Sequence, residues 1–375
     1  MNDLLAAAVV LAAATGCDRI TPPDPPLPPL LVVEVPVPPN TGLHDTFIRD
    51  GIAFLSAWRA GLTILDVGNG VRGGTPAAPV EITTFVPTPA ALSRRAVHNV
   101  WWVHNPVRQE NRYLFLGQAG TSGDLIVLDV SDLAQPREVA SYHVDGAGTH
   151  NFWMDEARQV LYMAYYNAGV VALDVSGTLS GDLVTRELAR VEPGGADNTS
   201  VWGVMLANGR LYASDMLSGF WQLDATTLLP LAGGNNVAER LGSDLWVRGG
   251  YGYTGTWGNR TGITVGNVIK VWALSPSGAP TLADSVTIAG IFSVTDVEVS
   301  DNGKLLMASA VGASGQGGLY WYRLTNPAAP ALVASIHIES GVHAASFARI
   351  NGKLFAFAAR NAPNSALLIY DVSGL

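Results

Sequence analysis

The chain has 375 residues and a formal net charge of −9 at pH 7. This acidic balance repels a phosphate backbone, and no run of Lys and Arg reverses it locally, so we expect no nucleic-acid partner. Hydrophobic residues make up 48% and charged residues 14%, a composition typical of a globular protein with a large core. Cys17 is the single cysteine, which excludes disulfides, thiol nucleophiles and thiolate metal sites from the rest of the chain.

The amino-terminal residues read as an export signal. Residues 4–14 (LLAAAVVLAAA) form an apolar run too short to span a bilayer as a helix, and small residues lead from it to Cys17. This arrangement resembles the lipobox of bacterial lipoproteins, which implies a signal peptide over residues 1–16 and a lipid on Cys17. Ala14 stands where leucine is usual, and Met1-Asn2-Asp3 lacks a positive charge, so an ordinary cleaved signal is the alternative. Both interpretations predict export, and the first predicts a cell-envelope protein tethered to a membrane, periplasmic or on the cell surface.

A proline-rich segment follows. Residues 21–29 (TPPDPPLPP) favour an extended polyproline-like chain. We therefore interpret residues 17–29 as the lipid-attachment cysteine and a stiff spacer, and residues 30–375 as one folded domain.

That domain repeats a short apolar strand that ends in Asp-Val-Ser or a variant of it. The copies are LTILDVG (62–68), LIVLDVS (125–131), VVALDVS (170–176), FWQLDAT (220–226), IKVWALS (269–275), LYWYRLT (319–325) and LLIYDVS (367–373). Their spacing is about 50 residues, apart from an insertion at 104–111 in the second copy. We predict that the repeated Asp accepts backbone N–H groups of the following turn, a structural role.

Each copy lies among further strand-like segments. One precedes it, as in RYLFLGQ (112–118), and several copies are followed by a proline-led strand, as in PREVASY (136–142). With the strand that opens each unit, this makes four antiparallel strands per repeat, which predicts an all-β, seven-bladed β-propeller. The last unit stops after its third strand, whereas residues 29–35 (PLLVVEV) look like a fourth strand, so we expect an N-terminal strand to close the ring.

The units also resemble a known family. Strand LIVLDVSD (125–132) followed by QPREVASY (135–142) resembles the LVIVD repeat of bacterial and archaeal surface proteins. This resemblance implies a propeller at the cell surface but no shared catalytic residue set, because fold alone does not give function. Kelch repeats have a similar period, but the paired glycines here have no fixed place in each unit.

Candidate site residues open the first strand of each blade, the strand that lines the central channel of a propeller. These residues are His44-Asp45, His98-Asn99, His150-Asn151, Val201-Trp202, Ser243-Asp244, Thr295-Asp296 and His343-Ala344. Because His44, His98, His150 and His343 fall on consecutive blades of a closed ring, they could hold a divalent transition metal at one channel mouth. The structural alternative is that these repeated side chains hydrogen-bond to backbone across the blades.

Two smaller candidates concern ligand access. His104 begins the insertion and could cover the channel, or be an exposed loop residue. Trp202 and Trp257 could stack on a sugar or aromatic ligand, or pack between blades.

These observations favour an exported, membrane-tethered monomer that acts as a binding or scaffold protein, with a protein or glycan ligand left unidentified and no catalytic residue assigned. The alternative is a metal-dependent hydrolase or lactonase at the His-lined mouth. A purely structural envelope protein is the third possibility. The first two differ in geometry, because a metal enzyme needs at least three of the four His side chains to converge on one point.

Overall fold

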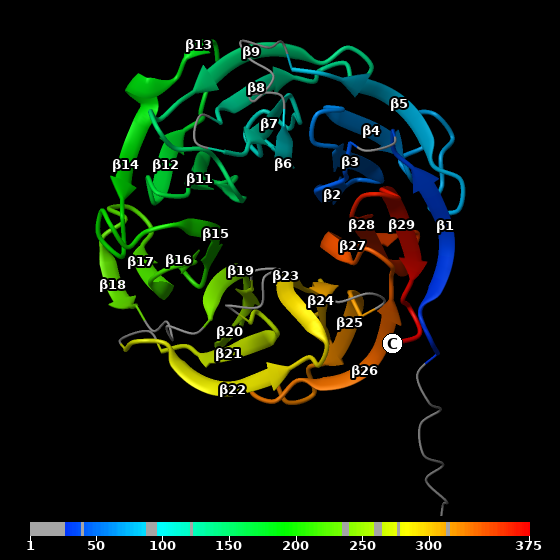
Figure 1. Ribbon diagram of the computed structural model, residues 1–375. Helices are drawn as coiled ribbons and strands as arrows, with labels where there is room; N and C mark the ends of the chain where they lie inside the picture. The colour runs from blue at the N-terminus through cyan, green and yellow to red at the C-terminus, as the bar shows by residue number, and fades with distance from the viewer. Residues whose placement is uncertain are drawn as a thin grey trace, which may run out of the picture.

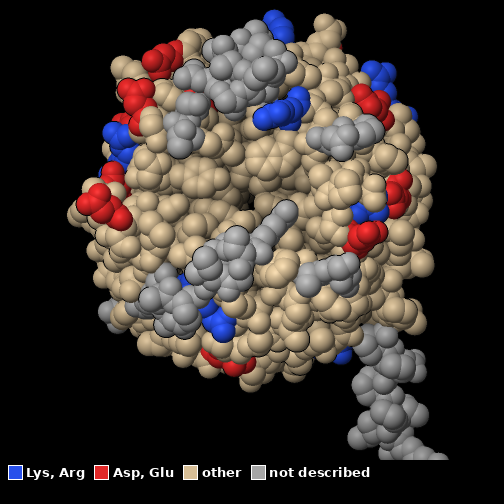
Figure 2. Space-filling view, in the orientation of Figure 1, with Lys and Arg blue, Asp and Glu red and all other residues tan. Residues whose placement is uncertain are grey.

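The fold is a ring of seven antiparallel sheets around a central axis, as predicted (Figure 1). The structure is a computed structural model that describes residues 27–38, 41–87, 96–120, 123–234, 240–258, 265–275, 278–312 and 316–375. The face in Figure 2 is hollowed at its centre, where the atoms are uncharged, and its Lys, Arg, Asp and Glu atoms lie toward the rim. The signal peptide, Cys17 and most of the spacer fall outside the described residues.

Each blade contains four strands from the axis outward, in chain order except that the outermost strand of blade seven is the N-terminal one. Blade one is β2 (Asp45–Arg49), β3 (Ile52–Ser56), β4 (Leu62–Asp66) and β5 (Val80–Phe85). Blade two is β6 (Val97–Trp102), β7 (Tyr113–Gln118), β8 (Leu125–Asp129) and β9 (Arg137–Tyr142). Blade three is β10 (Phe152–Asp155), β11 (Val160–Ala164), β12 (Val170–Asp174) and β14 (Glu187–Val191).

The remaining blades follow the same order. Blade four is β15 (Val201–Ala207), β16 (Arg210–Asp215), β17 (Gly219–Asp224) and β18 (Pro230–Gly233). Blade five is β19 (Leu241–Arg248), β20 (Tyr251–Trp257), β21 (Val268–Ala273) and β22 (Thr281–Thr287). Blade six is β23 (Ile291–Val299), β24 (Leu305–Gly312), β25 (Gly318–Arg323) and β26 (Ala331–His337). Blade seven is β27 (Val342–Ile350), β28 (Lys353–Arg360), β29 (Ala366–Asp371) and β1 (Leu30–Pro36).

The N-terminal strand closes the ring, which confirms the prediction. Strand β1 pairs antiparallel with β29, from Leu30 opposite Asp371 to Pro36 opposite Ala366. A further backbone hydrogen bond of 3.1 Å joins Leu27 N to Gly374 O. The two ends of the chain therefore share one sheet, and a proline is tolerated there because β1 is an edge strand.

The core lies between neighbouring blades. The sheets stack face to face, so apolar side chains of one blade pack against those of the next. Trp321 of blade six, for example, contacts Tyr370 of blade seven, with ring centroids 6.2 Å apart. Trp321 is fully buried. Burying an aromatic side chain of this size stabilises the fold by about 2–3 kcal/mol, so these interfaces hold the ring together.

The repeated Asp residues cap turns, as predicted. Both carboxylate oxygens of Asp66 accept backbone N–H groups, those of Gly68, Asn69, Gly70, Arg72 and Gly74. Asp129, Asp174, Asp224 and Asp371 each accept the N–H two residues ahead. These hydrogen bonds hold the pKa of Asp66 at about 2 despite its burial.

Blade two carries a fifth strand that the repeat pattern did not predict. Strand β13 (Gly181–Asp182) comes from the segment after β12 and pairs parallel with β9. The same segment contains a short 3₁₀ helix at Val184–Arg186. Without β13, the outer edge of β9 would be unpaired, so this segment covers a free strand edge.

Candidate functional site

The innermost strands bring four histidines together at the axis. The ring centroid of His44 lies 3.7 Å from that of His98 and 4.0 Å from that of His343, and the His98 and His150 centroids are 4.2 Å apart. His44, His98 and His150 are all at least 95% buried. The structure therefore brings these four side chains together, and they pack ring against ring.

Two tryptophans complete this layer. Trp202 stacks on His150 at 4.5 Å, Trp257 lies 4.6 Å from Trp202, and His343 lies 6.2 Å from Trp257. The rings thus form a continuous circuit around the axis, which we call the aromatic layer: His44, His98, His150, Trp202, Trp257 and His343. Trp202 and Trp257 pack within this layer.

Hydrogen bonds link two of the histidines, His44 and His150, to neighbouring blades, whereas His98 Nδ1 is buried without a hydrogen-bond partner. His44 Nδ1 bonds to His98 O at 2.9 Å, and His150 Nδ1 bonds to Trp202 O at 2.7 Å. Burial lowers the pKa of His44 and His98 well below the usual value and that of His150 to about 3, and the neighbouring histidines lower them further. Neutral imidazoles that join blades through their ring nitrogens are what the structural alternative predicts.

The described residues contain no group of three or more His, Cys, Asp or Glu side chains arranged to hold a metal ion. A metal on His44, His98, His150 and His343 stays a prediction that rests on the sequence.

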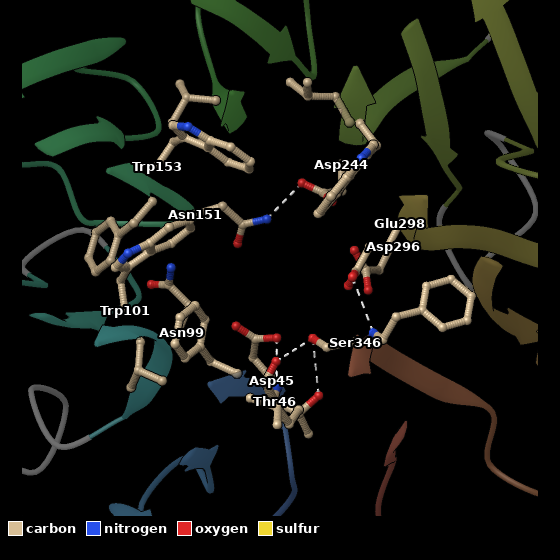
Figure 3. A pocket seen from close by; sticks show the side chains of 18 residues that line it. Asp45, Thr46, Asn99, Trp101, Asn151, Trp153, Asp244, Asp296, Glu298 and Ser346 are labelled. Carbon is tan, nitrogen blue, oxygen red and sulfur yellow. Dashed lines mark hydrogen bonds between the residues drawn. The ribbon is translucent and has the colours of Figure 1, made fainter. Parts of the chain in front are cut away.

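A cavity of about 190 Å³ lies one layer further along the same strands (Figure 3). Its floor contains the side chains that follow the histidines and their equivalents in the repeat, together with one glutamate. We call this set the acidic layer: Asp45, Asn99, Asn151, Asp244, Asp296 and Glu298. Blade four contributes Gly203 instead, where an added Cβ would lie 2.7 Å from Asp244 Oδ1, so a side chain there would displace a floor residue.

Hydrogen bonds orient part of the acidic layer. Asn151 Nδ2 donates to Asp244 Oδ1 at 2.7 Å, the backbone N–H of Ala345 donates to Asp296 Oδ2 at 2.8 Å, and that of Phe347 donates to Glu298 Oε1 at 3.2 Å. Asp244 and Asp296 lie close enough for each carboxyl group to influence the pKa of the other.

Of the four carboxyl residues, Asp244 is buried, and Asp45, Asp296 and Glu298 are half-buried. Burial and the charge of Asp296 together raise the pKa of Asp45 to about 8. Burial and neighbouring carboxylates likewise raise the pKa of Asp244 and Glu298 well above the ordinary range. The described lining residues include no Lys, Arg or His that could compensate the charge.

Aromatic side chains form the wall above the floor. The ring of Trp101 lies 5.2 Å from that of Phe47 and 5.3 Å from that of Trp153, which in turn lies 5.9 Å from Trp246. Phe347 also lines the cavity. We call these five residues the aromatic wall. A cavity with apolar rings above and polar groups below is the usual form of a small-molecule site.

Two polar atoms of this site have no hydrogen-bond partner. They are Asn99 Oδ1 and Trp101 Nε1, and Asn99 is 4% exposed. Neither atom exposes surface to the recess, and Asn99 Oδ1 lies against Gly117, where an added Cβ would be 2.4 Å away. Buried polar atoms without partners cost about 1–3 kcal/mol each, so these two atoms reduce the stability of the fold.

The sequence analysis did not predict the aromatic wall, although the sequence contains a pattern that indicates it. Side chains two residues apart on a strand point to the same face. Four of the five wall residues, and Glu298, follow other residues of the acidic layer at this spacing, in Asp45-Thr-Phe, Asn99-Val-Trp, Asn151-Phe-Trp, Asp244-Leu-Trp and Asp296-Val-Glu. His104 does not line the cavity. Its backbone N–H donates to Glu156 Oε1 at 2.9 Å, and its Nδ1 bonds to Asn111 Oδ1.

Comparison with known families supports the repeat. Residues 113–144, which span β7 to β9, match the LVIVD repeat. This chain is a β-propeller that contains an LVIVD repeat. The match covers one blade, and the structure shows the same four-stranded unit in all seven sheets. No curated protein matches the chain.

Solved structures share the fold of this LVIVD-repeat propeller at low identity. A chain of the "Mitotic Checkpoint Complex" has a TM-score of 0.65 at 13% identity, covering 99% of this chain and 98% of that one. The propeller domain of Myceliophteria thermophila Cps50 (Swd1) has 0.64 at 11%, covering 92% and 99%. The designed protein Ika8 has 0.55 at 12%, covering 88% and 83%. These similarities show the fold alone. No helix of the described residues has the length and apolar character needed to cross a bilayer.

Proposed function

We propose that this LVIVD-repeat propeller is a binding protein that takes a small ligand, or one end of a larger protein or glycan, into its central cavity. The observation that carries this proposal is the cavity itself, with its acidic layer below and its aromatic wall above. The aromatic layer lies beyond the floor on the same axis, so the cavity is a recess for a ligand. Such recesses with a few convergent polar groups are the usual ligand sites of folded proteins.

The metal-dependent hydrolase is less well supported. Ring nitrogens of His44 and His150 already bond to backbone carbonyl oxygens of the next blade. Both imidazoles therefore have a structural use that needs no ion. Ligand binding in the cavity should accordingly be unchanged by a chelator.

The proposal can be tested with a thermal-shift screen of the full chain against amines, guanidines, neutral sugars, carboxylic acids and short peptides. Two variants fill the cavity, Asn151→Phe and Ser346→Phe, because both positions line it. We expect at least one compound class to raise the melting temperature of the wild type, and both folded variants to lose that shift.

Two outcomes would contradict the proposal. In the first, no compound class raises the melting temperature of the wild type. In the second, the same rises in melting temperature persist in both variants while circular dichroism shows native strand content. In the second case the ligand binds elsewhere on the ring.

We also propose that the protein is exported and tethered to a membrane through a lipid on Cys17. What supports this is the sequence alone, namely the apolar run at residues 4–14 and the small residues before Cys17. The spacer would then join the ring at β1, on the outer edge of blade seven.

A further inference from the structure

The floor of the cavity is rich in carboxyl groups. Four of them face one recess, and none of the described lining residues is basic. The guanidinium of Arg49, at the end of β2, lies 5.6 Å from the centre of the Phe47 ring, but it donates to Trp102 O and pairs with Glu156. Its charge is therefore paired with a carboxylate that is not one of the four at the floor.

Asp45 faces the recess with spare acceptor capacity. The only hydrogen bond that its carboxyl receives from the described residues comes from the backbone N–H of Thr46. A carboxyl oxygen in this state can accept a further N–H or O–H group.

The aromatic wall suits the body of a cation. Indole and phenyl faces attract ammonium and guanidinium groups, by about 0.5–2 kcal/mol depending on desolvation. Trp101, Trp153 and Trp246 lie on three blades along one side of the recess. A cation that enters between them meets apolar surface along its stem and acceptors at its end.

We propose that the ligand of the central cavity is an organic cation that carries N–H donors, a protonated alkylamine or a guanidinium compound. This inference rests on the proposed function and names its ligand class. The charged end would reach Asp45 at the floor, and the alkyl stem would lie against the aromatic wall.

Binding should also release protons. The titratable groups that face the cation are Asp45, Asp244, Asp296 and Glu298, and the histidines of the layer beneath are neutral. Because burial raises the pKa of these carboxyl groups, a cation that stabilises their ionised forms should displace protons to solvent. We therefore expect tighter binding at pH 8 than at pH 6.

The test is calorimetric titration of the full chain with agmatine and cadaverine, compared with choline, 1-pentanol and glucose. We expect agmatine or cadaverine to bind with a proton release that appears as a buffer-dependent enthalpy. Choline, which carries charge without N–H groups, and the neutral pentanol should bind at least tenfold more weakly. Asp45→Asn should weaken amine binding at least tenfold.

The matched control is Asp145→Asn, which removes the same charge from a fully exposed loop residue. It should leave the affinity unchanged. If a neutral sugar or an acid binds and is blocked by Asn151→Phe while neither amine binds, the inference is overturned and the proposed function stands. If no probe or library compound binds, or amine binding survives both cavity-filling variants, both proposals are overturned.

Discussion

At the scale of single residues, the carboxyl of Asp45 makes stability depend on pH. Its pKa is about 8 in the folded protein and 3.8 in the unfolded reference. Between these values the folded state holds a proton that the unfolded state has lost, so the stability contributed by this group falls as pH rises from about 4 to about 8. Asp45→Asn cannot ionise at this position. We therefore expect its free energy of unfolding, relative to that of the wild type, to rise by at least about 1 kcal/mol from pH 5 to pH 8.

Urea unfolding at both pH values measures this difference. The control is Asp145→Asn, whose carboxyl lies in solvent. A stability gap between Asp45→Asn and wild type that is the same at pH 5 and pH 8 would show that the Asp45 carboxyl is ionised in the folded protein.

The turn-capping carboxyl of Asp66 acts in the opposite direction. Its pKa of about 2 lies below the reference value, so it stabilises the fold above pH 4, and this contribution is lost as pH falls toward 2. Asp66→Ala leaves five backbone N–H groups without their acceptor. We expect it to lower the free energy of unfolding by about 2–3 kcal/mol at pH 7. Urea unfolding checks this, and a loss equal at pH 7 and pH 2.5 would contradict the capping role.

At the scale of elements, the ring depends on its last sheet. Strand β1 is the outer strand of blade seven and comes from the opposite end of the chain to β27, β28 and β29. Without it, β29 becomes an exposed edge and blade seven has three strands. We expect a chain that begins at Val37 to melt at least about 5 °C below a chain that begins at Leu27.

Differential scanning calorimetry of these two chains makes the comparison. Glu34→Gln is a useful control, because it removes only the partly exposed ion pair with Arg360 and should cost less than about 1 kcal/mol. Equal melting temperatures for the two chains would mean that β1 pairing does not hold the ring closed.

At the scale of the whole molecule, the attachment point of the proposed lipid tether is separate from the cavity. Strand β1 lies at the rim of the ring, whereas the cavity lies on the axis (Figure 1). A lipid attached upstream of β1 would therefore leave the cavity open to a ligand. We expect the wild-type chain made in bacteria to incorporate an alkyne fatty acid and to sediment with membranes, and Cys17→Ser to do neither.

The control is the unchanged cavity, since Cys17→Ser should bind the same compounds as the wild type. An unlabelled, soluble wild-type chain would instead support an ordinary cleaved signal. Labelling that persists in Cys17→Ser would place the lipid on another residue.

The sequence by itself determined the blade count, the strand order and the N-terminal closure. These features repeat locally about every 50 residues, and pairing between strands such as β8 and β9 depends on neighbours in the chain. The repeat also identified His44, Asp45 and their equivalents as axial residues. Strand β13 escaped prediction because its two residues pair with another blade's edge and carry no repeat signal.

Only the tertiary structure decided which of these residues face a cavity and which pack. His44 and Asp45 are adjacent in the chain, yet the imidazole joins a packed aromatic layer and the carboxyl faces an empty recess. Spacing along a strand cannot distinguish these outcomes, because the cavity exists only where side chains from several blades meet across the axis. The raised pKa values of Asp45 and Glu298 have the same origin, since burial and repulsion between carboxyl groups arise only once the ring has closed.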